Sequence, residues 1–226
     1  MLPDPLPDDP LPLFVAWFED ARARKVSANP DAMVLATVAT DTQPPQPSAR
    51  VVLCKDIDPR EGYLVFYTNY ASRKGTELAR AAACCAVFHW DSDERQVRVE
   101  GVAVPSPAAE SDAYFASRHP GSRVGAWASE QSRPLDSRAT LLANVTAAAR
   151  RFNVPLRDGL EARNVDVDIP RPPHWGGYRL WIRAIELWHG GSHRVHDRAR
   201  YTRHLELSDD GRVRADGGWH ASRLQP

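Results

Sequence analysis

Short runs of β-branched and aromatic residues, separated by turns rich in proline and glycine, constrain the fold of this chain most strongly. Met33–Thr40, Ala49–Ile57 and Tyr63–Thr68 are of this kind and predict strands. Gly190 and Gly191 predict a tight hairpin turn. Further strands are expected at Cys85–Trp90, Gln96–Val104, Tyr178–Trp188, His193–Leu207 and Trp219–Leu224.

Helices are predicted between the strands and outside them. Phe14, Trp17, Phe18 and Ala21 repeat at helical spacing and predict a first helix. Other helices are expected at Arg73–Ala82, Ser106–Ser117 (with Ser106 as N-cap and Pro107 in the first turn) and Ser137–Phe152. Because helices and strands do not alternate strictly, we expect a mainly β, α+β fold, an antiparallel barrel with flanking helices.

The domain organisation is expected to be simple. The 226 residues suffice for one core, and no repeat or linker interrupts them, so residues 1–226 are predicted to form a single domain. Residues 1–10 are acidic and proline-rich and are expected to be disordered or loosely docked. Residues 153–174 show no periodicity and predict a long loop.

Composition excludes several classes of function. Lys+Arg and Asp+Glu both number 29, so no net charge draws the chain to nucleic acid or membrane. With no apolar spanning run and no visible signal peptide, a cytoplasmic protein is expected. Cys54, Cys84 and Cys85 form neither a disulfide framework nor a zinc motif, so no metal is expected.

The first cluster with chemical potential is the segment Gly190–Arg198. If this segment is a strand, Arg194, His196 and Arg198 share one face, where they repel one another unless an anionic or electron-rich ligand lies among them. An exposed strand with solvated charges is the alternative. Zinc binding by His193 and His196 is disfavoured because nothing completes the ligand set.

The second cluster, Tyr67–Gly75, predicts a phosphate site. A strand leads through a polar turn into a helix that begins with Arg73 and Lys74, so N–H groups, hydroxyls and cations converge there. A cation-capped surface turn is the alternative. The segment is not a Walker A motif, because the required glycine spacing is absent.

Further candidates lie on other elements. Tyr114 and Arg118 share a helix face and Ser122 follows, which indicates a second phosphate site or a surface cluster. Arg50 and Lys55 fall on opposite strand faces unless a bulge intervenes. Two phosphate sites and an aromatic-bordered cationic strand suggest two phosphorylated ligands bound together.

Several segments carry a resemblance to a known family. RVVLCK, FYTNYASRKG, RQVRVEG, SDAYFASR, GAWASEQSRPLDSR, PHWGGYRL, ELWHGGSHRVHDRARY and RLQP occur in the order found in pyridoxamine 5'-phosphate oxidases. The chain resembles this family from about residue 10 to its C-terminus. The resemblance implies an FMN-binding split barrel and a homodimer with flavin at the subunit interface. It also implies oxidation of pyridoxamine or pyridoxine 5'-phosphate to pyridoxal 5'-phosphate by O2, giving H2O2, in vitamin B6 metabolism.

The resemblance also assigns roles to residues. Arg194 and His196 are expected to face the substrate ring and to be catalytic. The substrate set is Lys55, Tyr114, Arg118 and Ser122 together with that pair. The expected FMN set is Arg50, Val51, Val52, Leu53, Cys54, Lys55, Tyr67, Thr68, Arg73, Lys74, Gln96, Gln131, Ser132, Trp188 and Arg198.

The chain departs from the family pattern in places, and two other functions stay open. Cys54 replaces an aliphatic residue, the N-terminus lacks a basic, tyrosine-containing arm, and residues 153–174 are longer than expected. The alternatives are a related FMN oxidase of phenazine biosynthesis and a non-catalytic protein that binds FMN or pyridoxal phosphate. The substrate-phosphate set argues against the first, and Arg194 with His196 argues against the second.

Overall fold

The computed structural model describes residues 1–156, 167–208 and 211–226. These residues form two compact units. The barrel unit comprises Met1–Phe66, Glu77–Val104 and Arg179–Pro226, and the helical unit comprises Tyr67–Thr76 and Pro105–Tyr178. Each unit is built from segments that are distant in sequence, and the expected single domain stays a prediction.

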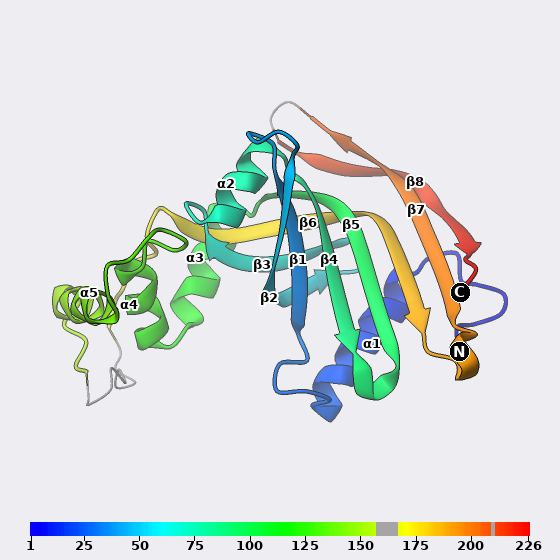
Figure 1. Cartoon of the computed structure of the whole chain (residues 1–226), viewed down its shortest axis with the longest axis horizontal. Helices are drawn as coiled ribbons and strands as arrows, with labels where there is room; N and C mark the ends of the chain where they lie inside the picture. Colours follow the sequence, from blue (N-terminus) through cyan, green and yellow to red (C-terminus); the bar gives the residue numbers. More distant parts are fainter. Residues whose placement is uncertain (157–166, 209–210) are drawn as a thin grey trace. The chain divides into compact units, whose positions relative to one another are not determined.

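The strands form one antiparallel sheet that closes on itself (Figure 1). The order is β3-β2-β1-β4-β5-β6-β7-β8, and an additional β3–β6 pairing closes the first six strands into a barrel, as predicted. The hairpin of β7 and β8 continues beyond β6. The bounds are β1 Ala32–Ala39, β2 Gln46–Asp58, β3 Tyr63–Asn69, β4 Ala83–Trp90, β5 Arg95–Pro105, β6 Trp175–His189, β7 Asp197–Leu207 and β8 Val213–Arg223.

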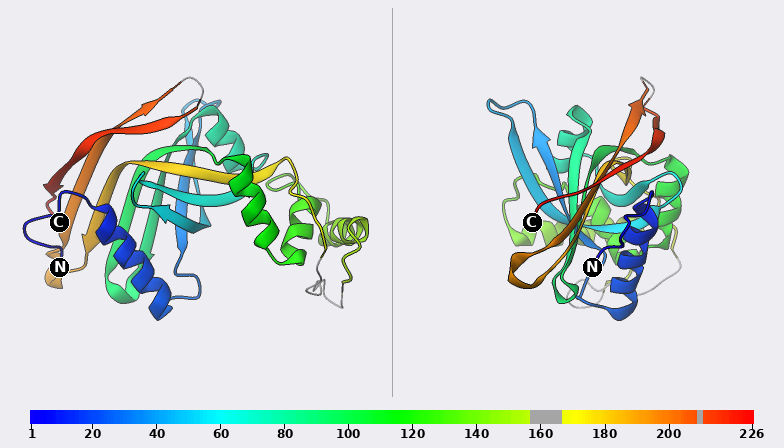
Figure 2. Two further views of the ribbon diagram at one scale, coloured as in Figure 1. Left: turned by 180° about the vertical axis from the view of Figure 1, so that it is seen from behind. Right: turned by 90° about the vertical axis from the view of Figure 1, so that its right-hand side faces the viewer.

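The first helix, α1 (Leu11–Arg24), attaches to the barrel through the face that the sequence predicts. Phe14, Trp17, Phe18 and Ala21 are all buried. The rings of Phe14 and Phe18 contact Phe88 of β4, with centroids 5.4 and 5.8 Å apart, and α1 runs alongside β4 and β5 (Figure 2). Burial of each such ring contributes about 1.5–3 kcal/mol.

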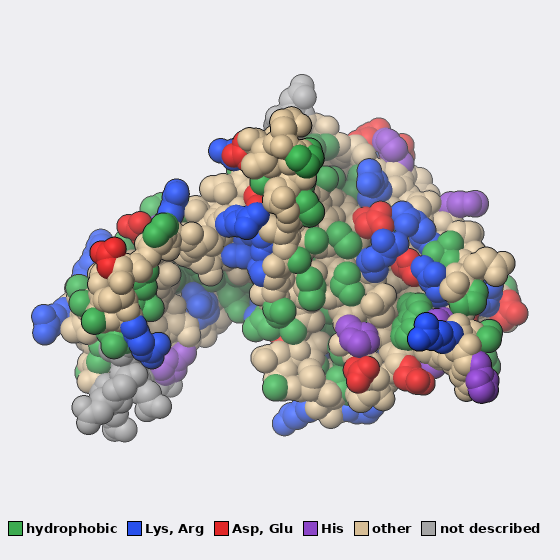
Figure 3. Space-filling model, in the orientation of Figure 1, with side chains coloured by type: hydrophobic (Ala, Val, Ile, Leu, Met, Phe, Trp, Pro, Cys, Tyr) green, Lys and Arg blue, Asp and Glu red, His purple; other side chains and the backbone are tan. Residues whose placement is uncertain are grey.

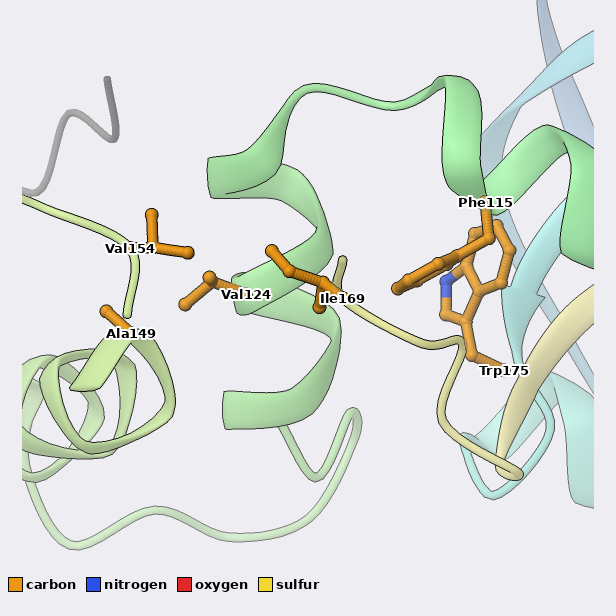
Figure 4. Packing of buried hydrophobic residues seen from close by; sticks show 6 residues of the cluster. All are labelled: Phe115, Val124, Ala149, Val154, Ile169 and Trp175. Carbon is orange, nitrogen blue, oxygen red and sulfur yellow. The ribbon is translucent and has the colours of Figure 1, made fainter. Parts of the chain in front are cut away.

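The helical unit contains α3 (Ala108–Ser117), α4 (Pro120–Ala128) and α5 (Arg138–Arg151), and α4 packs on α5. Figure 4 shows its core, in which side chains from these helices meet the segment that leads into β6. The core residues are Phe115, Val124, Ala149, Val154, Ile169 and Trp175. Residues 153–156 and 167–174 form no helix, and the rest of the expected long loop lies outside the described residues.

Two details of the helices differ from the prediction. α4 was not predicted, because its sequence contains two glycines and gives little helical signal. Its N-cap is His119, whose ring accepts the Gly121 N–H. The N-cap of α3 is Pro107 rather than Ser106. The Ser106 N–H instead donates to the Gly177 carbonyl at 2.9 Å.

Within residues 1–10, expected to be disordered or loosely docked, Leu2 and Pro3 contact the rest of the barrel unit. Leu2 is buried at 6% exposure, and its N–H donates to the Asp197 carboxylate at 2.7 Å. Arg223 donates to the Pro3 carbonyl at 2.8 Å. Both termini therefore lie beside the start of β7, as Figures 1 and 2 show. Within the described residues, none of the helices has the length and apolar character needed to cross a bilayer.

Candidate functional site

The connection between β6 and β7 holds the residues expected to be catalytic, and its conformation differs from the prediction. Residues 193–196 are not part of a strand, because β7 begins at Asp197 and Ser192–Arg194 form one turn of 3₁₀ helix. His193 (φ 57°) and Arg194 (φ 65°) are left-handed, which a strand does not allow. Arg194 and His196 therefore do not share a strand face with Arg198, and the two glycines do not make a two-residue hairpin.

A single glycine makes this connection possible. A Cβ on Gly191 would lie 1.9 Å from the Val195 carbonyl oxygen, so no other residue fits there. The Gly191 N–H donates to Nδ1 of His196 at 3.3 Å. In this arrangement the neutral His196 ring carries its proton on Nε2. The ring also contacts Trp188, with centroids 4.7 Å apart.

The backbone of the same β6–β7 connection is strained. Two consecutive non-glycine residues, His193 and Arg194, adopt positive φ. Each such residue costs about 1 kcal/mol or more, and strain of this kind concentrates at ligand sites. The Arg194 side chain is exposed. The structure thus brings Trp188 and His196 together and presents Arg194 on a strained, solvent-accessible turn.

Strand β2 carries the expected residues 50–55. Arg50 donates to the Leu35 carbonyl at 3.1 Å and forms an ion pair with Glu77 at 3.3 Å. The register of β2 against β3 shifts between Cys54 and Asp56, so the bulge that the sequence left open is present at Lys55. Lys55 forms an ion pair with Asp31 at 2.8 Å.

The remaining residues of this set, Val51, Val52, Leu53 and Cys54, lie along the same strand. Val51 is exposed, whereas Cys54 is buried. Burial raises the pKa of the Cys54 thiol to about 12. The thiol is therefore protonated at neutral pH and is not a nucleophile.

The turn between β3 and α2 (Arg73–Arg80) brings three expected cofactor residues together within the helical unit. Lys74 is buried, and its Nζ donates to the Thr68 hydroxyl and to the Gln131 side-chain oxygen, both at 3.0 Å. The Thr68 hydroxyl donates to the same Gln131 oxygen at 3.3 Å. Ser72, which belongs to the predicted cluster Tyr67–Gly75 but not to the expected FMN set, is fully buried and accepts from Lys74 at 3.2 Å. An ammonium, hydroxyls and the start of a helix thus converge, as the sequence predicted.

The tightness of this turn explains its glycine. A Cβ on Gly75 would lie 2.2 Å from the Tyr70 carbonyl oxygen. The Ser72 hydroxyl donates to the Asn69 carbonyl at 2.6 Å, and the Asn69 side chain accepts the Ala71 N–H at 2.8 Å. These contacts fix the backbone that carries Arg73 and Lys74. The donor set suits a phosphate, whose oxygens accept from cations, hydroxyls and N–H groups.

A stack of aromatic rings lies in the helical unit. Tyr67 and Tyr114 are parallel with centroids 3.8 Å apart, and Tyr67 and Trp175 stack at 5.6 Å. Arg118 lies over the Trp175 ring at 4.7 Å. Among the described residues, its Nη1 is buried without a hydrogen-bond partner. Burial lowers the pKa of Arg118, although a guanidinium stays charged at neutral pH.

An unpaired buried guanidinium donor costs about 1–3 kcal/mol or more. The arrangement around Arg118 therefore fits an anionic ligand that would accept from Nη1. The sequence predicted Tyr114 and Arg118 here but not Trp175. The segment PHWGGYRL contained that signal, because its tryptophan stands beside two glycines where β6 begins.

Three other expected site residues have defined positions, but among the described residues their side chains are not linked to the rest of the expected site. Ser122 lies in the first turn of α4, Gln96 lies opposite His89 at the β4–β5 pairing, and Ser132 lies between α4 and α5 with φ 72°. In the described part of the chain, no hydrogen bond or ion pair connects their side chains to other expected site residues.

Comparison with known families gives two matches in sequence order. Residues 20–151 match the family described as pyridoxamine 5'-phosphate oxidase. Residues 175–226 match the C-terminal dimerisation region of pyridoxine 5'-phosphate oxidase.

Individual relatives agree with these matches. A pyridoxine/pyridoxamine 5'-phosphate oxidase of Burkholderia lata is 47% identical over 218 residues, which covers 96% of this chain and 89% of the relative. One of Cupriavidus metallidurans is 45% identical over 224 residues, covering 96% and 89%.

Solved structures share the fold. PhzG of Burkholderia lata, in complex with tetrahydrophenazine-1-carboxylic acid, superimposes with a TM-score of 0.77 at 30% identity, covering 97% of this chain and 94% of that one. An FMN-binding, pyridoxamine 5'-phosphate oxidase-related protein of Nostoc punctiforme gives a TM-score of 0.63 at 14% identity, covering 94% and 96%. From the family match over residues 20–151 and the identity to these relatives, the chain belongs to the pyridoxamine 5'-phosphate oxidase family.

Proposed function

We propose that this protein is an FMN-dependent oxidase that converts pyridoxamine or pyridoxine 5'-phosphate to pyridoxal 5'-phosphate. The observation that carries the proposal is Arg118, whose buried Nη1 lacks a partner among the described residues and whose guanidinium lies over the Trp175 ring, which stacks with Tyr114. A flat aromatic ligand that carries a phosphate matches this surface. The relatives at 47% identity bear the name of this activity.

FMN is the cofactor that membership in this family implies. The turn between β3 and α2 fits the phosphate of FMN, since Lys74, Thr68 and Ser72 gather there at the start of α2. When bound, FMN supplies a two-electron acceptor that dioxygen regenerates. Overall, pyridoxamine 5'-phosphate, dioxygen and water give pyridoxal 5'-phosphate, ammonia and hydrogen peroxide.

The residues of the β6–β7 connection would orient the substrate. Arg194 stays charged and acts by position and field, and its exposed side chain is available to a ligand. His196 accepts the Gly191 N–H on Nδ1, so its neutral ring would donate to a ligand from Nε2. Within the helical unit, Arg118 would bind the substrate phosphate.

We also propose that the protein is a homodimer in the cytoplasm. The match to a dimerisation region over residues 175–226 supports the dimer. Val34 and Val51 are paired neighbours on β1 and β2 and are 42% and 65% exposed. Figure 3 shows hydrophobic side chains gathered over the central strands in that view. Gel filtration should give a yellow dimer, and a colourless, stable monomer that cannot be reconstituted with FMN would contradict the proposal.

A phenazine-type oxidase is the second candidate, because the structure of PhzG superimposes well on this chain. The discriminating feature is the phosphate. Hydrogen peroxide release should be measured with pyridoxamine 5'-phosphate, pyridoxine 5'-phosphate, their unphosphorylated forms and tetrahydrophenazine-1-carboxylic acid. Turnover confined to the phosphorylated substrates supports the proposal. Turnover of the phenazine compound alone would favour the second candidate, and FMN binding without any turnover would indicate a binding protein.

A further inference from the structure

A buried carboxylate on β6 lies between two guanidinium groups in the barrel unit. Glu186 is only 4% exposed. Arg198 donates from Nε and Nη2 to its Oε1 at 3.0 and 2.8 Å. Arg98 donates from Nη2 to its Oε2 at 2.9 Å. Both carboxylate oxygens are therefore engaged by charged donors, each from a different strand.

The charges continue along neighbouring strands. Arg98 also forms an ion pair with Glu100 at 3.2 Å, and Arg200 forms one with Glu100 at 3.0 Å. Three guanidiniums and two carboxylates alternate, which leaves one positive charge on the group. Figure 3 shows acidic and basic side chains side by side over the strands at the right of the view.

We infer that Glu186 is a positioning residue for FMN, acting through Arg198. This inference rests on the proposed function, in which Arg198 belongs to the FMN site. The third nitrogen of Arg198, Nη1, donates to the Gln225 carbonyl at 2.9 Å, so all three nitrogens are held by the protein. Nη1 and Nη2 each keep a second N–H, and these donors have a fixed direction.

Because the Arg198 side chain is already oriented, binding of FMN would cost less conformational entropy. A free arginine side chain loses about 0.5–1.5 kcal/mol of conformational freedom when a ligand immobilises it. Glu186 and Gln225 restrict Arg198 beforehand, and the excess positive charge of the group suits an anionic or electron-rich ligand. Buried ion pairs often contribute little to stability compared with apolar residues of similar size, so stability alone does not account for Glu186.

The test measures FMN affinity of the apoprotein by quenching of flavin fluorescence. Glu186→Gln should raise the dissociation constant of FMN about tenfold, because Arg198 loses the charged acceptor that orients it. Glu100→Gln removes one negative charge from the same cluster of charged side chains, but Glu100 pairs with Arg98 and Arg200 rather than with Arg198. This variant should change the dissociation constant of FMN less than about twofold. Arg198→Ala should weaken binding at least as much as Glu186→Gln. The double variant Glu186→Gln/Arg198→Ala should bind FMN no more weakly than Arg198→Ala alone, because Glu186 acts through Arg198 and the two effects are not independent.

Three results would overturn the inference. These are wild-type affinity in Glu186→Gln, an equal loss in Glu100→Gln, and additive losses in the double variant. If Glu186→Gln does not fold, Arg198→Lys replaces it: lysine keeps the charge but not the fork, so it should bind FMN as weakly as Arg198→Ala. Wild-type affinity in Arg198→Lys would equally contradict the inference. A wild-type protein that binds no FMN would overturn the proposed function as well, whereas normal wild-type binding with an unaffected Glu186→Gln overturns only the role of Glu186.

Discussion

Tyr67 and Tyr114 stack face to face, with ring centroids 3.8 Å apart and planes inclined by 12°. Tyr67 lies on β3 and belongs to the set expected to bind the cofactor, whereas Tyr114 lies on α3 and belongs to the set expected to bind the substrate phosphate. Trp175 extends the stack and carries Arg118 on its face at 4.7 Å. The two sets therefore share one aromatic surface in the helical unit, and substitutions at Tyr114 should affect both ligands.

Arg118→Ala should weaken substrate binding while leaving the stability of the protein almost unchanged. Loss of a charge-assisted bond of about 1.5–3 kcal/mol should raise KM for pyridoxamine 5'-phosphate about ten- to a hundredfold. The free energy of unfolding should change by less than about 1 kcal/mol, because the lost contact with Trp175 is offset by removal of a buried, unsatisfied donor. Steady-state kinetics and thermal denaturation measure the two quantities.

Arg151→Ala is the matched control for this prediction. Arg151 also lies over a tryptophan, Trp127, at 4.5 Å in the same unit, but it belongs to no expected site. Its substitution should leave KM unchanged. A normal KM in Arg118→Ala, or equal turnover of pyridoxine and its phosphate by the wild type, would contradict the phosphate role of Arg118.

The sequence predicted the barrel well, because its strands and α1 express their burial in local periodicity. The face of Phe14, Trp17, Phe18 and Ala21 is the buried face of α1. The residue types of the turn before Lys74 were also informative, since the ammonium of Lys74 and the hydroxyl of Thr68 meet there as the sequence predicted.

Features that depend on tertiary contacts were missed. The two glycines Gly190 and Gly191, followed by His193–Leu207, predict a hairpin turn and a strand that begins at His193. The left-handed residues and the close approach of Gly191 to Val195 override that pattern. In the same way, Leu2 is ordered by Asp197, nearly the whole chain away, which no local signal contains.

Arg194→Ala should lower kcat by about 10²–10³, the effect of losing one preorganised donor, while FMN stays bound. His196→Ala should lower kcat by about tenfold or somewhat more. His193→Gly serves as the control: it relieves a left-handed residue (φ 57°) and should keep kcat while raising Tm slightly. If Arg194→Ala loses FMN but turns over normally with excess FMN, Arg194 belongs to the cofactor site instead.

Deletion of residues 1–4 should destabilise the start of β7. It removes the burial of Leu2, a contribution of about 1.5–3 kcal/mol, and the N–H donor to Asp197. Tm should fall, and amide hydrogen exchange should increase around the loop that carries Arg194 and His196. Asp8→Ala, at an exposed position of the same segment, should change neither. Unchanged exchange in the deletion variant would mean that this contact does not support the loop.

Tyr178 should make the helical unit sensitive to alkaline pH. Burial, with a smaller contribution from Tyr70, raises the pKa of Tyr178 to about 12. The two rings meet edge to face at 5.3 Å. A raised pKa means that the folded state favours the protonated phenol. The stabilisation is therefore complete below the unfolded pKa of about 10, and it is lost as pH rises through about 12.

Tm measured from about pH 9 to pH 12 should fall more steeply for the wild type than for Tyr178→Phe, which keeps the ring but cannot ionise. At neutral pH the phenol is protonated in both the folded and the unfolded state, so the difference in slope should appear only at alkaline pH. Tyrosinate absorbance of the folded protein should show a group titrating near pH 12 that disappears in Tyr178→Phe. Parallel Tm curves for the two proteins would show that ionisation of Tyr178 is not linked to unfolding.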